Sequence, residues 1–383
     1  MRRFAAGFVS VLSVALLGGC AQQGSSNVTV SGKSLTLYLS EPVGSAASDP
    51  VAQDVSNAEQ LAFSDHHGEV SGFTLTLRVL HGAKLSDNAR TAISDTTHAI
   101  AYLGEIQPGD SADSLGITND QGLLQVTPTD TAVELTQQSS AVSGSPGVYY
   151  EALKNYGRTF TRVVPTSAKE AKAQASEMQS MGVKQLYIAS DGSDYGKAIA
   201  AALRGDVSGA GITVASSASG ADAVFLAGRN PAAFASVVRA NPTLKVFAPS
   251  AFASSSAVSA LGLGSGGKLY VSTPGFLKKQ LGAAGQKFVT DFTTKYGHAP
   301  ATEAILGYEA MAAVLHVLAQ AGTKANERST VVKNFLALRK VAFVLPTQWS
   351  INNATGDTSL GAFVFSRARA GTLVPFAAVT APG

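Results

Sequence analysis

The sequence of 383 residues contains a single cysteine, Cys20, and only six histidines. One cysteine excludes a disulfide within the chain, and the spacings CxxC and HxxxH, which are typical of metal ligands, do not occur. The two adjacent histidines, His66 and His67, do not share a face of a helix. The sequence therefore predicts neither a metal site nor a cofactor.

The short motifs that mark many enzymes on α/β folds are also missing. Neither the phosphate-binding loop GxxxxGK(S/T) nor the nucleophile elbow GxSxG occurs. Residues 262–267 match the dinucleotide pattern GxGxxG, but they are predicted to follow a helix and to precede a strand. That order is the reverse of a nucleotide site and favours a loop after a helix. We predict that the protein is not an enzyme and has no catalytic residues.

Charged residues are scarce, at 14% of the sequence, and the formal net charge is +3 at pH 7. Two of the cations, Arg2 and Arg3, lie in a segment that we expect to be removed, which leaves a net charge of about +1. A nearly neutral chain lacks the basic surface that nucleic acid requires. We therefore predict no nucleic-acid partner.

The first twenty residues have the pattern of a lipoprotein signal peptide. Arg2 and Arg3 precede an apolar run over 4–17, which closes on Leu17-Gly18-Gly19-Cys20. That run, of about 14 residues, is too short to cross a bilayer core of roughly 30 Å as a helix.

We predict that the signal peptide, residues 1–19, is cleaved and that the Cys20 thiol carries a lipid. The small polar residues up to 33 predict a flexible tether over 20–33. The protein would then be exported and anchored to the outer face of the cell membrane, or be periplasmic if the envelope has two membranes.

Beyond the tether, apolar runs typical of strands alternate with longer, Ala-rich amphipathic stretches. Strands are predicted at 35–39, 73–80, 98–103 and 123–126, and helices at 50–66 and from 167. This alternation predicts an α/β fold with mostly parallel sheets covered by helices on both faces. About 350 residues follow the tether, so two domains are expected. The tail over 348–376 predicts antiparallel edge structure.

Several motifs along the mature chain occur in an order that has a known parallel. They are EPVG at 41–44, VTPTDT at 126–131 with ELT at 134–136, RVVPTS at 162–167, DGSDYGK at 191–197, ADAVFLAG at 221–228, KYG at 295–297 and GYEA at 307–310. Together they resemble the branched-chain amino-acid (leucine, isoleucine, valine) binding family of type I periplasmic binding proteins.

The resemblance implies two α/β lobes joined by three crossover strands, which close like a hinge around a small solute. The crossings are expected near 162–167, 271–275 and 344–348. Lobe 1 would then contain 34–163 and 273–344, and lobe 2 would contain 164–272 and 345–383. The resemblance further implies a receptor that delivers its solute to the permease of an ABC transporter.

By the same resemblance, the ligand-binding residues include two hydroxyls after the fourth strand, Thr129 and Thr131, and a cleft tyrosine, Tyr195. Turn chemistry around Pro128 explains the two threonines equally well. The family has a serine in a GP-x-x-S turn, but the corresponding turn in this sequence is Gly104-Glu105-Ile106-Gln107-Pro108 and lacks it. Ser111 is expected to replace that serine. Ser250 and Phe276 complete the predicted set.

One departure from the family affects the ligand. The acidic partner of an α-ammonium group is expected after the strand near 247, but residues 248–252 contain no carboxylate, and a buried ammonium without an anion is strongly penalised.

Two hypotheses follow. The first is a receptor for an amino acid or a related small carboxylate or amide. The second is a ligand-free envelope lipoprotein of the same fold that acts through protein contacts. The two differ in whether polar groups from both lobes gather around one pocket.

Overall fold

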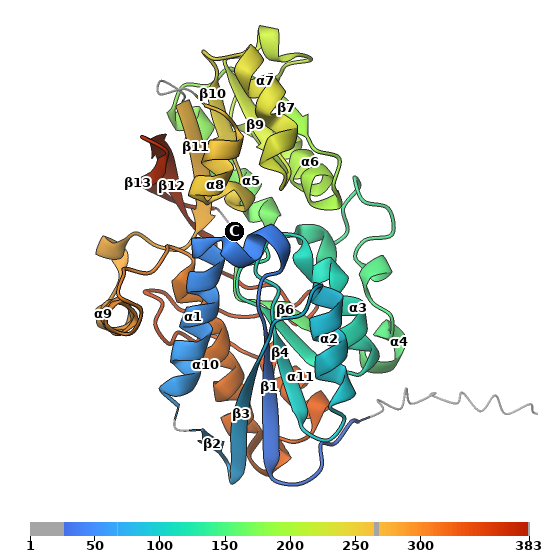
Figure 1. The fold of residues 1–383 in the computed structure, drawn as a ribbon. Helices are drawn as coiled ribbons and strands as arrows, with labels where there is room; N and C mark the ends of the chain where they lie inside the picture. Colours follow the sequence, from blue (N-terminus) through green and yellow to red (C-terminus); the bar gives the residue numbers. More distant parts are fainter. Residues whose placement is uncertain (1–26, 67, 264–267, 382–383) are drawn as a thin grey trace, which may run out of the picture.

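The computed structural model describes residues 27–66, 68–263 and 268–381, which form two α/β lobes stacked end to end (Figure 1). The predicted signal peptide and Cys20 lie outside these residues, as does 264–267 of the glycine-rich loop. That loop does follow a helix, α8 (Ser255–Ala260), and precede a strand, β11 (Lys268–Pro274), as the sequence predicted.

Lobe 1 is built on a six-stranded sheet in the order β2-β3-β1-β4-β5-β6. All neighbours are parallel except β2, which pairs antiparallel with β3. Its central strands are almost wholly buried, because helices cover both faces. The strands are β1 (Ser34–Ser40), β2 (Glu69–Val70), β3 (Phe73–Leu80), β4 (Ala99–Leu103), β5 (Leu124–Thr127) and β6 (Phe160–Arg162).

The helices of lobe 1 come from both halves of the chain. The most extensive contact joins α1 (Pro50–Ser64) to α10 (Ala304–Ala321). They approach closely because Gly307 has no side chain, and a Cβ there would overlap the carbonyl oxygen of Val55. The others are α2 (Leu85–Ser94), α3 (Leu115–Asp120), α4 (Leu153–Tyr156), α9 (Ala283–Tyr296) and α11 (Arg328–Leu336).

Helix α10 is long and apolar enough to cross a bilayer, and among the described residues it alone passes that test. However, 67% of its most apolar window is buried. Its side chains, including Met311, Val314 and Leu318, belong to the core of lobe 1. Its hydrophobicity is therefore accounted for by packing within the lobe.

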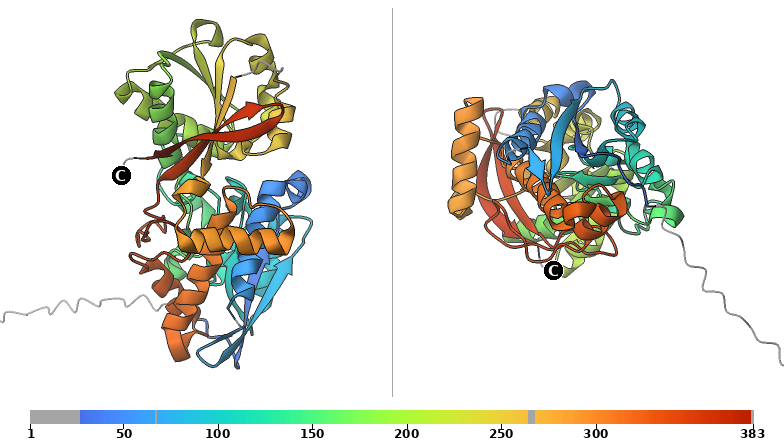
Figure 2. Two further views of the ribbon diagram at one scale, coloured as in Figure 1. Left: turned by 90° about the vertical axis from the view of Figure 1, so that its left-hand side faces the viewer. Right: turned by 90° about the horizontal axis from the view of Figure 1, so that it is seen from below.

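Lobe 2 contains a seven-stranded sheet in the order β13-β12-β11-β10-β9-β7-β8. The strands from β8 to β11 are parallel, and the last two strands add an antiparallel edge, as the tail of the sequence suggested. The left view of Figure 2 shows this red hairpin lying across lobe 2. The strands are β7 (Gln185–Ser190), β8 (Thr213–Val214), β9 (Ala223–Ala227), β10 (Lys245–Ala248), β11, β12 (Ala362–Arg369) and β13 (Thr372–Thr380).

Alternating side chains of the lobe 2 strands enter two different cores. On β9, Phe225 packs with helices α5 (Ser167–Ser180) and α6 (Asp194–Gly209). Its neighbours Val224 and Leu226 pack on the opposite face with α7 (Ala235–Ala240) and α8. This two-sided burial explains why the strand is a continuous apolar run.

The chain passes between the lobes three times, and the third passage differs from the expected position. The first two connections follow β6 and β11. Residues 345–360, which the sequence assigned to lobe 2, instead place Trp349, Ile351 and Leu360 in the core of lobe 1. The third passage therefore lies next to β12, because these apolar side chains are buried in lobe 1.

The start of the folded region also differs from the expected boundary at residue 34. The backbone N–H of Val30 donates to the Asn326 carbonyl at 2.8 Å, and that of Arg328 donates to the Val28 carbonyl at 3.0 Å. Val30 is fully buried. The last residues of the predicted tether are thus part of lobe 1, beside α11.

Candidate functional site

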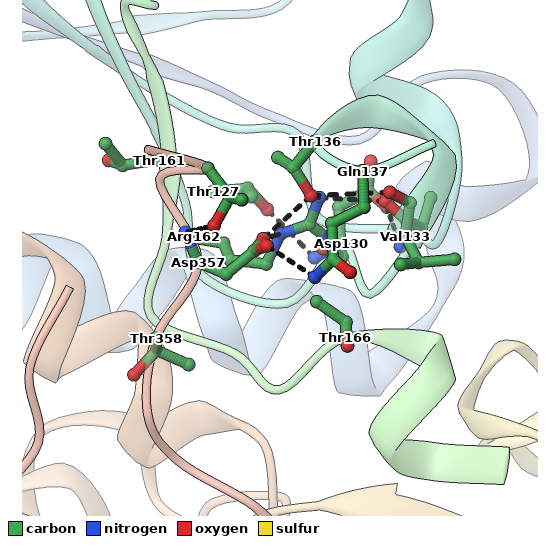
Figure 3. A network of polar contacts seen from close by, with 12 residues as sticks. Thr127, Asp130, Val133, Thr136, Gln137, Thr161, Arg162, Thr166, Asp357 and Thr358 are labelled. Carbon is green, nitrogen blue, oxygen red and sulfur yellow. Dashed lines mark hydrogen bonds and ion pairs between the residues drawn. The ribbon is translucent and has the colours of Figure 1, made fainter. Parts of the chain in front are cut away.

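The connections between the lobes are tied together by a buried arginine at the end of β6 (Figure 3). Arg162 has no exposed surface, and its Nε lies 2.9 Å from Asp357 Oδ1, in the segment that leads to the third connection. Its terminal nitrogens donate to the carbonyls of Asp130 and Ala132, at 2.7 and 2.8 Å. Thr136 also donates to Asp357, at 2.7 Å. The arginine therefore holds the loop after β5 in place.

That loop carries Thr129 to the boundary between the lobes. Its hydroxyl donates to the Ile106 carbonyl at 2.6 Å. It lines a cavity of about 10 Å³, the volume of roughly one water molecule. Both lobes contribute to the lining, which consists of Asp49, Val51, Ala52, Ile106, Gln107, Pro108, Thr129 and Glu303 from lobe 1 and Ser250, Ala251 and Ala253 from lobe 2.

Directly behind Ser250 lies a buried carboxylate that sequence reasoning missed. The Ser250 N–H donates to Glu170 Oε1 at 2.7 Å, and the Ser250 hydroxyl donates to Oε2 at 3.2 Å. Ser272 adds a donor at 2.6 Å. Glu170 comes from the first turn of α5 and not from residues 248–252, where an acidic group was sought. One signal was available, since Ser167, Glu170 and Gln174 place polar groups on a buried helix face.

Two hydroxyls in this region lie near each other and make no hydrogen bond of standard geometry with the described residues. They are Thr131 Oγ1 and the Tyr195 hydroxyl, and both residues are buried. The pKa of Tyr195 is raised well above its usual value by burial and by the negative charge of Glu170. Tyr195 comes from the first turn of α6, whose N-cap is the Ser193 hydroxyl.

The carboxylates at the lobe boundary are unusual in lacking a cation. Burial raises the pKa of Glu170 to about 7, although hydrogen bonds from Ser272 and Ser250 oppose the shift. Burial, together with the charges of Glu170 and Asp49, raises the pKa of Glu303 well above its usual value. No lysine or arginine is among the described residues that line the cavity. A cation placed beside these carboxyl groups would favour their ionised forms, so the site suits a cationic group.

The lobes are in direct contact around the cavity. Arg229, after β9, forms an ion pair with Asp110 of lobe 1 and donates to the Pro108 carbonyl at 3.2 Å. On another side, the Tyr149 hydroxyl donates to Asp194 of α6 at 3.1 Å. These contacts hold the cleft closed in this structure.

Solved structures with the same two-lobed architecture cover nearly the whole chain. A leucine-binding protein from Thermotoga maritima has 18% sequence identity and a TM-score of 0.70, over 91% of this chain and 98% of its own. The chain has the type I periplasmic-binding-protein fold. The predicted fold and α/β class are confirmed.

Two further structures with the type I fold are similar. A branched-chain amino-acid transporter substrate-binding protein from Streptococcus pneumoniae, in complex with isoleucine, has 16% identity and a TM-score of 0.68, over 91% of this chain and 99% of its own. A solute-binding protein of an ABC transporter from R. palustris, in complex with benzoate, has 14% identity and a TM-score of 0.67, over 92% and 97%. No protein-family model and no curated protein matches the sequence.

Within the type I fold, the structure brings together only part of the predicted ligand-binding set. Thr129 and Ser250 line one cavity, and Thr131 and Tyr195 lie beside it as unpartnered hydroxyls. Ser111 is buried next to the loop after β5, since its N–H donates to Asp130 at 2.9 Å, but its hydroxyl already accepts the Glu105 N–H at 3.2 Å.

Phe276 lines a different cavity, of about 180 Å³, together with Phe288 and Ile305. In the part of the chain that the structure describes, no three histidine, cysteine, aspartate or glutamate side chains are grouped to hold a metal ion.

Proposed function

We propose that the protein is a solute-binding lipoprotein of an ABC importer, exported and anchored through Cys20, which binds an amino acid or a related small amine-bearing carboxylate or amide between its lobes. A permease of the same transporter would receive the solute. The observation that carries this proposal is the pair of buried carboxylates at the lobe boundary, Glu170 from lobe 2 and Glu303 from lobe 1.

Buried carboxylates without a cation are costly, because the folded protein must either strip water from the charge or take up a proton. An ammonium group placed between the lobes would compensate Glu170 and Glu303. The unpartnered hydroxyls of Thr131 and Tyr195 would then donate to a carboxylate or amide oxygen of the same solute. The type I fold, with its lobe boundary between two sheets, supports this assignment.

Entry of such a solute requires the lobes to separate. A cavity of about 10 Å³ holds no more than roughly one water molecule. The contacts of Arg229 with Asp110 and of Tyr149 with Asp194 must break as the lobes rotate about their three connections.

A thermal-shift screen of the chain from Ala21 onward tests this proposal. The panel contains amino acids, small amines, amides, carboxylates and sugars. A solute at a hundred times its dissociation constant stabilises the folded state by about 2.7 kcal/mol. We expect a shift with amine-bearing solutes and its loss in Glu170→Gln. Glu151→Gln, at an exposed position of lobe 1, is the matched control and keeps the shift.

A second function is favoured by the closed cleft itself. With almost no cavity and with direct bonds across it, the same structure suits a ligand-free envelope lipoprotein that acts through its surface. If no solute in the panel shifts the melting temperature, and small-angle X-ray scattering shows no separation of the lobes, this function is supported and the receptor is contradicted.

A further inference from the structure

A larger cavity, of about 480 Å³, lies on lobe 1, lined by residues of α11 and by residues 156–159, between α4 and β6. Its size lies within the range of small-molecule sites. It is separate from the cleft, and the two cavities share no residue. Its lining consists of Val28, Gly122, Asn353, residues 156–159, 328–329, 332–333 and 336–337, and Arg339.

The lining of this cavity is cationic. It contains Arg158, Arg328, Lys333 and Arg339, and no aspartate or glutamate. Within the described ranges, none of these four side chains forms an ion pair. Four uncompensated positive charges around one cavity create a field that attracts anions.

Arg328 is the most constrained of the four, with only 2% of its surface exposed. Its Nε donates to the Ala99 carbonyl at 2.9 Å, and its Nη1 donates to the Gln121 carbonyl at 2.8 Å. Because the guanidinium is planar, these two bonds fix the direction of Nη2, which has no partner in the described structure. A buried donor left unpaired is costly unless a ligand accepts from it.

The other three cations line the same cavity. Arg158 lies over the Tyr150 ring at 5.6 Å, and Lys333 is exposed on α11. Arg339 is held by carbonyls at the end of α11, including that of Leu338 at 2.8 Å. The rest of the wall combines apolar side chains, including Val28, Val332 and Leu336, with polar ones, including Thr159 and Ser329.

We propose that this cavity is a binding site for a phosphate group carried on a partly apolar molecule. A phosphate monoester has a charge of about −1.5 to −2 and three acceptor oxygens, which suits several cations better than a single carboxylate does. The phosphodiester of a phospholipid headgroup has one negative charge and two free acceptor oxygens. The planar guanidinium of an arginine can donate two parallel hydrogen bonds to two oxygens of one phosphate.

Two sources of the phosphate are compatible with this chemistry, a soluble phosphate ester and the headgroup of an anionic phospholipid. Val28 lines the cavity and follows the predicted lipidation site Cys20 by eight residues. An extended chain of that length reaches about 26–29 Å. A membrane that holds Cys20 would therefore lie within reach of the cavity.

The test uses the chain from Ala21 onward, which contains every residue that the structure describes and lacks Cys20. Binding of inorganic phosphate and of glycerol 3-phosphate is measured by calorimetry. Flotation is measured with phosphatidylcholine vesicles, with and without phosphatidylglycerol. Binding of glycerol 3-phosphate without flotation assigns a soluble ester, whereas flotation that requires phosphatidylglycerol assigns a lipid headgroup.

The double variant Arg158→Gln, Lys333→Gln should weaken binding roughly tenfold or more, because it removes two charge-assisted contacts. Lys333→Gln alone changes only an exposed side chain and should still weaken binding several-fold. The control, Lys184→Gln with Arg204→Gln, makes the same change in net charge at exposed positions of lobe 2 and should bind as the unmodified chain does. The proposal is overturned if the unmodified chain binds none of the probes at millimolar concentration, or if the double variant binds as tightly as the control.

Discussion

Arg162 joins two segments that lie far apart in the sequence. It contacts the loop after β5, through Asp130 and Ala132, and the segment that leads to the third connection, through Asp357. A buried ion pair is costly to break from one side, because the remaining charge stays buried. The loop that carries Thr129 and Thr131 therefore depends on it.

Replacing Arg162 with methionine should lower the free energy of unfolding by about 3–5 kcal/mol, since the Asp357 carboxylate loses its cation. Urea unfolding followed by circular dichroism measures the change. The double variant Arg162→Met, Asp357→Asn should recover part of the loss, because no unpaired charge remains. A loss below about 1 kcal/mol in Arg162→Met would show that the pair does not stabilise the connections.

At the residue scale, the family resemblance predicted ligand-binding positions but not their partners. Thr129 and Ser250, two of the predicted residues, line one cavity, and their binding of a ligand stays a prediction. Glu170 was missed because its contact with Ser250 joins residues 80 positions apart. Nothing in a local pattern specifies a contact of that range. Only the polar character of the buried face of α5 hinted at it.

At the scale of elements, the contact between α1 and α10 depends on the lack of a side chain at Gly307. Gly307→Ala should destabilise the protein by about 1–3 kcal/mol, because the added methyl group forces the helices apart. Gly205→Ala, in helix α6 with nothing near its Cβ position, should instead stabilise by about 0.5–1 kcal/mol. Thermal unfolding of the two variants measures both changes. Equal effects in the two would refute close packing at Gly307.

The buried parallel strands were well predicted, since they are short apolar runs, whereas the short edge strands β2 and β8 were not predicted. The predicted strand at 73–80 coincides with β3. The third connection was misplaced because lobe membership of 345–360 is decided by distant partners. Trp349 donates from its indole to Glu309 of α10 at 2.6 Å, and this contact draws the segment into lobe 1.

For the whole molecule, buried carboxylates should determine how stability changes with pH. Burial raises the pKa of Glu105 to about 8, of Glu134 and Glu170 to about 7, and of Asp110 to about 6. Each value exceeds that of the unfolded chain, so the folded state binds these protons more tightly. Their contribution to the free energy of unfolding is complete below the pKa of each group in the unfolded chain. It is lost as the pH rises through the pKa of the group in the folded protein.

We therefore expect the melting temperature of the ligand-free protein to fall between pH 5 and pH 8. Glu105→Gln should make this fall smaller, because its amide does not ionise. Hydrogen bonds lower the pKa values of Asp95 and Asp191, so these two groups change the stability only at more acidic pH. Calorimetric scans at several pH values provide the measurement. A melting temperature that rises over this range would contradict the assignment of buried, protonated acids.

The position of the third connection also has a consequence for the order in which the chain can fold as it is synthesised. The β11 edge of lobe 2 stays uncovered until β12 and β13 have been made, because residues 270–274 pair with 363–367. Lobe 1 likewise waits for α10 and α11, which follow the first five strands of lobe 2 in the chain. Neither lobe is complete before about residue 360, so a ribosome that stops before residue 362 releases a chain with an open strand edge, which is prone to aggregation.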